Sequence, residues 1–154
     1  MRFPFLAPMV LLVLAPSTAG GPARQPSPAA DVVVAPFSVD RDSAGVLRAL
    51  ADTCLDHLIN GLKTKGIAVE RRPELSEKKL DAARPAPWAL LGRLARDAGQ
   101  FQAELRLLGV ESGEELRSYF NADKNPTAII KFGELAAVRI ANFIEEQKGS
   151  HRAQ

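Results

Sequence analysis

The sequence has a single cysteine, two histidines and almost no excess of charge of either sign. One cysteine excludes an intrachain disulfide. Two histidines without a spaced set of cysteines argue against a structural zinc site. The formal net charge of +2 comes from 20 Lys and Arg against 18 Asp and Glu, so nothing suggests binding to nucleic acid.

Catalytic motifs are also missing from the sequence. It contains no phosphate-cradling glycine loop, no metal-ligand cluster and no nucleophile with an evident base and orienting residue. We therefore predict that the protein is not an enzyme and has no catalytic residues, metal site or cofactor. One alternative is a thiol-dependent enzyme centred on Cys54, with His57 three residues further along the same helix. The favoured interpretation is that Cys54 packs as a small, inert apolar side chain.

The longest apolar run lies at the N-terminus and is too short to span a bilayer, which takes ~20 residues. After Met1 and Arg2, residues 3–14 are apolar apart from two prolines, and small residues precede a cleavage position after Ala19. This pattern is typical of a secretory signal peptide over residues 1–19. We therefore expect export to a bacterial periplasm, with no transmembrane span once the leader is cleaved.

The rest of the chain divides into a linker, one domain and a tail. Residues 20–30 (GGPARQPSPAA) lack any period and are rich in Pro, Gly and Ala, which predicts a flexible linker. The folded domain is expected over residues 31–148. Gly149 is expected to end the last helix, which leaves residues 149–154 as a disordered tail.

The first half of the domain alternates strand and helix signals. Residues 31–37 (DVVVAPF) predict a strand covered on both faces. A helix follows, capped by Asp42 or Ser43 and ended by Gly66. A short strand over residues 67–71 and a short helix over residues 75–83 come next. The apolar stripe of the first helix comprises Val46, Leu47, Leu50, Ala51, Cys54, Leu55, Leu58, Ile59 and Leu62.

The stretch from residue 88 to residue 120 predicts a three-stranded antiparallel meander. Strand-like segments cover residues 88–95, 101–107 and 116–120, separated by turn chemistry at 97–99 and 112–113. In the third strand, Leu116, Ser118 and Phe120 share one side, while Tyr119 is expected with Arg117 and Asn121 on the outer side.

A last helix is predicted to begin with Asn125 as its cap and Pro126 in its first turn. The element order is therefore β-α-β-α-β-β-β-α. This order predicts an α/β fold with a mixed sheet of about five strands and helices packed on it. Gly92 in a strand and Gly133 in the last helix are expected to allow close packing.

This order of elements and several of its sequence words resemble the N-terminal domain of TolB and related envelope domains of the CsgG, FlgO and LpoB types. The words are VVVAPF, LRALADTCLDHLINGL, GIAVERR, WALLGRLARDAGQFQAELRLLGVESGEEL and IIKFGELAAVRIANFI, which together extend over residues 31–146. The chain departs from the family in its second helix, which is short and runs into Arg84-Pro85-Ala86-Pro87.

The resemblance implies a non-enzymatic periplasmic binding or adaptor domain whose partner is another envelope protein. An alternative is a subunit of an outer-membrane or appendage assembly, in which case the protein forms oligomers. Trp88 and Tyr119 are the candidate partner-binding residues, since aromatic side chains are enriched in binding hot spots. Core packing is the favoured interpretation for Trp88.

Overall fold

A computed structural model describes residues 28–40 and 44–153 of the chain. The elements follow in the order β1 (Val32–Val34), β2 (Ser38–Val39), α1 (Ala44–Thr64), β3 (Val69–Arg71), η2 (Glu77–Ala83), β4 (Trp88–Asp97), β5 (Gln100–Gly109), β6 (Glu115–Asp123) and α2 (Pro126–Arg152). The expected signal peptide, most of the expected linker, and the candidate caps Asp42 and Ser43 lie outside the described residues.

One mixed sheet organises the fold, with strand order β3-β1-β4-β5-β6 and with β2 also paired to β4. β1 lies parallel to β3 and β4, whereas β4, β5 and β6 form the antiparallel meander. The predicted α/β class and mixed sheet are therefore confirmed. The sixth strand, β2, was not predicted. It forms because the chain continues beyond Pro36 and pairs Ser38 and Val39 in parallel with Arg93 and Leu94.

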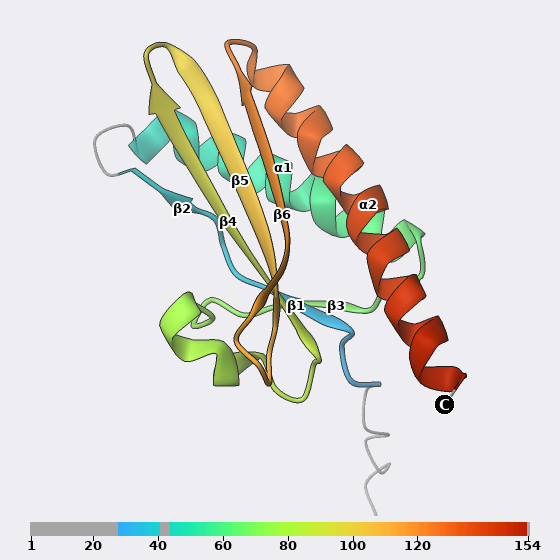
Figure 1. The fold of residues 1–154 in the computed structure, drawn as a ribbon. Coiled ribbons are helices and arrows are strands. Elements are labelled where there is room, and N and C mark those ends of the chain that lie inside the picture. The colour runs from blue at the N-terminus through green and yellow to red at the C-terminus, as the bar shows by residue number, and fades with distance from the viewer. Residues whose placement is uncertain (1–27, 41–43, 154) are drawn as a thin grey trace, which may run out of the picture.

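Both long helices cover one face of the sheet. Most of the core is buried between these helices and the strands. α1 crosses behind the strands and α2 runs beside β6 (Figure 1). The two helices approach closely, because a Cβ added at Gly133 would lie 2.7 Å from the Cys54 carbonyl oxygen. Gly92 similarly leaves room for the Phe37 ring. Both predicted packing glycines are thus confirmed.

The opposite face of the sheet is only partly covered. A smaller core of Val33, Ala35, Leu75, Ala83, Ala86, Ala89 and Val110 lies beneath η2. The segment expected as a helix over residues 75–83 is a 3-10 helix that begins at Glu77, with a non-helical residue, Lys79, inside it. The outer parts of β4, β5 and β6 remain open on this face.

The helix ends follow local chemistry, with one correction. Gly66 adopts a positive φ of 81° after α1, and the Asn125 side chain accepts a hydrogen bond from the Thr127 backbone N–H at 2.9 Å, as predicted. Gly149, however, does not end α2, which continues to Arg152. Gly149 lacks a left-handed φ, and the Ser150 hydroxyl donates to the Glu146 carbonyl, so the helical backbone continues past the glycine.

One residue of the predicted α1 stripe is misplaced. Val46 is 72% exposed, whereas Leu47 beside it is buried. The core therefore begins one position later than the apolar pattern suggested. Among the described residues, no helix is long and apolar enough to cross a membrane.

Candidate functional site

A groove of about 270 Å³ lies between the last strand of the sheet and α2. β6 is the terminal strand, so β5 pairs with one of its sides and no described strand pairs with the other. Three consecutive β6 residues and one side of α2 supply the walls. The lining residues are Tyr119, Phe120, Asn121, Ala128, Phe132, Leu135, Ala136 and Arg139.

Exposed apolar side chains gather around this groove. Phe120 is 64% exposed, Leu135 is 62% exposed and Val138, one turn along α2 from Leu135, is 40% exposed. The fourth large apolar side chain exposed among the described residues, Val46, belongs to α1. Apolar side chains exposed beside the free side of an edge strand are typical of a protein-binding site.

The orientation of β6 differs from the sequence prediction. Tyr119 lies opposite the buried Leu105 and packs against the core beneath the helices, so it does not face outward. Phe120 therefore points to the open face. Arg117 shares the helix-covered side with Tyr119, and its guanidinium lies 4.4 Å from the centre of the Phe143 ring on α2. This contact and the packing of Tyr119 hold the odd-numbered residues from Arg117 onwards on the helix-covered side, which the alternation of polar and apolar residues did not indicate.

Tyr119 is half-buried and still lines the groove. Burial raises the pKa of its phenol, an effect that the positive charges of Arg117 and Arg139 oppose. The hydroxyl is therefore neutral at physiological pH and is suited to donating a hydrogen bond from the groove.

Trp88, the other candidate partner-binding residue, does not line this groove. It begins β4, pairs with Val32 and Gly109 on either side, and packs half-buried against the main core. The structure therefore brings Tyr119, and not Trp88, to the apolar surface.

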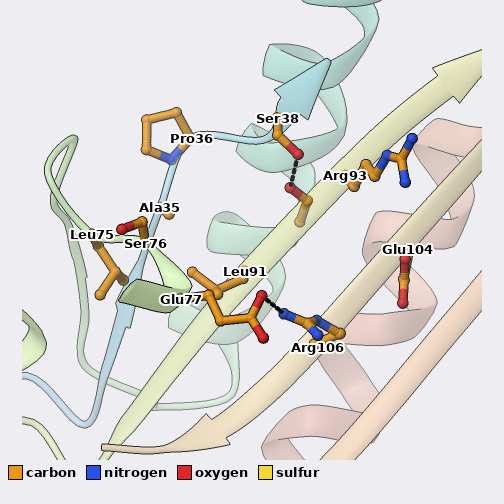
Figure 2. A pocket seen from close by; sticks show the side chains of 11 residues that line it. Ala35, Pro36, Ser38, Leu75, Ser76, Glu77, Leu91, Arg93, Glu104 and Arg106 are labelled. Atoms are coloured by element: carbon orange, nitrogen blue, oxygen red, sulfur yellow. Dashed lines mark hydrogen bonds and ion pairs between the residues drawn. The ribbon is translucent and has the colours of Figure 1, made fainter. Parts of the chain in front are cut away.

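A second hollow, of about 390 Å³, lies on the open face of the sheet between η2 and strands β4 and β5. Figure 2 shows the side chains that line it, among them Leu75, Leu91 and the charged Arg93, Glu104 and Arg106. More charged residues line this hollow than line the β6–α2 groove.

Three of the four charged side chains around this second hollow, Glu77, Arg93 and Arg106, are already paired. Arg106 donates to Glu77 at 2.7 Å and lies 3.7 Å from Glu115, while Arg93 donates to Asp40 at 3.3 Å. The hydrogen bond to Glu77 raises the pKa of Arg106. These ion pairs tie η2 and the β1–α1 connection to the sheet, so the hollow presents few polar groups that need a ligand.

Cys54 is fully buried, and its thiol donates a weak hydrogen bond to the Ile129 carbonyl at 3.3 Å. Burial raises the pKa of this thiol to about 11, so it is protonated at neutral pH and shielded from reagents. His57 contacts Glu134 of α2 at 2.7 Å, a pairing between the two helices. The thiol-dependent alternative therefore has no activated nucleophile here.

The described residues contain no group of three or more His, Cys, Asp or Glu side chains that could hold a metal ion. The arrangement of the β6–α2 groove is suited to a different task. An unpaired strand can accept main-chain hydrogen bonds from a partner while apolar side chains on both sides bury its side chains.

No protein-family model matches the sequence, and no curated protein matches it. Among solved structures, the PelC dodecamer from Paraburkholderia phytofirmans is 15% identical, with a TM-score of 0.51 over 68% of this chain and 82% of that chain. TolB from Acinetobacter baumannii is 16% identical, with a TM-score of 0.47 over 77% of this chain and 29% of that chain. The LpoB C-terminal domain from Salmonella enterica is 15% identical, with a TM-score of 0.35 over 63% of this chain and 84% of that chain.

At these identities the likeness is one of fold. TolB and LpoB, both named in the sequence resemblance, are among the matched structures.

Sequence reasoning missed Phe120, Phe132, Leu135 and Val138 as surface residues. The sequence of α2 contains a pattern that could have identified Phe132 and Leu135. Beside the buried stripe, Phe132 and Leu135 follow one another at helical spacing on the neighbouring side. A second apolar stripe on a helix that is already packed along its first one indicates a further contact surface.

Proposed function

We propose that the chain is a non-enzymatic domain that binds another protein in the bacterial cell envelope through the β6–α2 groove. The observation that carries this proposal is the exposure of Phe120, Leu135 and Val138 around a terminal strand. The N-terminal leader pattern and the resemblance to envelope domains support the compartment, which is the periplasm.

The alternative of a subunit in a larger assembly is supported by the same exposed edge. PelC, whose fold this chain shares, is described as a dodecamer. An edge strand that carries apolar side chains favours pairing with a further polypeptide in either case.

Photo-crosslinking in intact cells tests the proposal. A crosslinking amino acid at position 135 should capture a protein, identified by mass spectrometry, because Leu135 borders the groove. The matched control places the same amino acid at position 46, where Val46 is at least as exposed but lies on α1. No capture at position 135, or equal capture at both positions, would contradict the proposed site.

A further inference from the structure

β6 lacks the features that usually protect the edge of a sheet. It is nine residues long and contains no proline. Five consecutive residues, Ser118 to Ala122, carry no charge; the charged residues of the strand are Glu115, Arg117 and Asp123. Protected edges are short, twisted away by bulges, or carry lysine or proline near their centre. The one irregularity of β6 lies near its start, opposite Leu107 and Leu108.

We propose that this edge pairs with β6 of a second copy of the chain, antiparallel and centred on Phe120. The inference rests on the second candidate function above, a subunit of a larger assembly, and identifies a second copy of the chain as the occupant of the β6 edge. The two sheets become one continuous sheet across a two-fold axis. Each Phe120 then lies opposite its counterpart on the open face, where cross-strand aromatic pairs are favourable.

Charge selects this register. With Phe120 at the centre, each Arg117 lies opposite Asp123 of the other copy, and both side chains are on the helix-covered side. A register centred on Tyr119 instead places Glu115 opposite Asp123, and like charges directly opposite one another are unfavourable. A register centred on Asn121 places Arg117 opposite Asn125 and leaves the acidic residue without a cationic partner.

The two charged side chains retain capacity for this pairing. Asp123 Oδ1 accepts a hydrogen bond from the Asn125 backbone N–H at 2.7 Å, and its second oxygen bonds to no described residue. Arg117 donates through Nη1 to the Leu116 carbonyl at 2.8 Å, which leaves further N–H groups on the same guanidinium.

The same axis also accounts for the exposed side of α2. Because α2 lies beside β6, a two-fold axis at Phe120 sets α2 of one copy next to α2 of the other. Leu135 and Val138 then become buried between the copies, and Phe132 and Tyr119 form the floor of that contact.

Engineered disulfides test the register directly. Opposed residues in an antiparallel pair have Cα atoms about 4.5–5.5 Å apart, within the range a disulfide requires. F120C should therefore crosslink to itself on mild oxidation. S118C and A122C should each remain uncrosslinked alone but crosslink when mixed, because positions 118 and 122 face one another only across the axis. Cys54 is fully buried and should not react in the folded chain.

The oligomeric state in solution tests whether the β6 edge holds two copies together. The full chain should sediment as a dimer, and F120E should raise the dissociation constant at least about a hundredfold by opposing two carboxylates at the axis. V46E is the matched control, since it places the same charge on an equally exposed apolar residue of α1 and should leave the dimer intact. Unchanged unfolding temperatures for both variants at low protein concentration would show that the monomer fold is retained.

Two results would overturn the inference. A wild-type chain that is monomeric up to about 100 µM would exclude the self-association proposed here. A dimer in which S118C alone crosslinks as fast as the S118C and A122C mixture would exclude this register. In the first case, capture of a different protein at position 135 in cells would leave the proposed function standing. Absence of any capture there would reject the proposed function as well.

Discussion

The two edges of the sheet are stabilised in different ways. β3, at one edge, has three residues and is followed by Arg72-Pro73, where the proline lacks an N–H donor. β6, at the other edge, has nine residues and no charge at its centre. The short edge is held mainly by polar contacts, whereas the long edge is held by apolar packing from the helix side.

Arginines secure the β3 edge. Arg71 pairs with Asp56 of α1, and Arg72 pairs with Glu70 at 2.8 Å. Arg72 also donates to the carbonyl oxygens of Ala82 and Arg84, which ties β3 to η2. These contacts fasten β3 to α1 and to the η2 segment. The comparison indicates that polar side chains border the short edge, whereas exposed apolar side chains border the long edge.

The largest expected effect comes from removing the apolar support of the β6 edge. Leu105 is fully buried on β5 directly opposite Tyr119. Leu105→Ala should lower the free energy of unfolding by about 3 kcal/mol, through lost burial and a residual cavity. Val69→Ala on the β3 edge, where the valine is only partly buried, should cost about 1 kcal/mol. Denaturant unfolding measures both; equal losses would contradict the asymmetry between the edges.

A smaller loss in the free energy of unfolding is expected when α2 is forced away from its position beside β6. A Cβ at Gly133 would lie 2.7 Å from the backbone oxygen of Cys54, so the helices must separate to accommodate it. Gly133→Ala should therefore destabilise the chain by about 2 kcal/mol. Gly149→Ala on the same helix has nothing within 4 Å and should be stabilising by about 0.5 kcal/mol through helix propensity. A stabilising Gly133→Ala would contradict the close packing of the two helices.

The polar contacts of the β3 edge should contribute less. Arg72→Ala removes the hydrogen bonds to the Ala82 carbonyl in η2 and to the Arg84 carbonyl just after it, and should cost about 1 kcal/mol. Arg84→Ala removes only an exposed ion pair with Asp81 and should be within about 0.5 kcal/mol of wild type. Limited proteolysis adds a second measurement. Cleavage near η2 should be faster in Arg72→Ala than in wild type, but not in Arg84→Ala. An unchanged cleavage rate in Arg72→Ala would show that Arg72 does not hold this edge.

Much of the fold could be predicted from the sequence because its signals are local. Periodicity locates both long helices, and glycine turns place the three antiparallel strands. The turn at Ala98 and Gly99 illustrates this, since both residues have positive φ, as a two-residue hairpin loop requires. β2 escaped prediction because two residues carry no period, and its pairing depends on Phe37 entering the core beside Gly92.

The candidate site was harder to predict because it depends on the facing of one strand. The alternation in residues 115–123 permits either side to face the core, and a shift of one residue exchanges the two sides. The sequence pattern favoured Phe120 inside, but the buried side is decided by Leu105 opposite Tyr119 and by Arg117 lying over Phe143. These contacts connect residues distant in sequence. The binding role expected for Tyr119 stays a prediction; the structure shows that it lines the groove and faces the opposite way from that expected.

The smallest expected effect is a change in how the unfolding temperature depends on pH, and it again distinguishes the β3 edge from the rest of the chain. The hydrogen bond from Arg72 lowers the pKa of the Glu70 carboxyl in the folded chain. A carboxyl with a lowered folded pKa adds stability above its unfolded pKa and loses that contribution as pH falls through the folded value. Because Glu70 is largely exposed, the effect is screened, and it should shift the unfolding temperature by less than about 2 °C. Glu70→Gln should therefore narrow the difference in unfolding temperature between pH 7 and pH 3. Glu146→Gln, an exposed position on α2, serves as the control and should leave that difference unchanged; an equal effect of both variants would show that the β3 edge gains nothing from this pair.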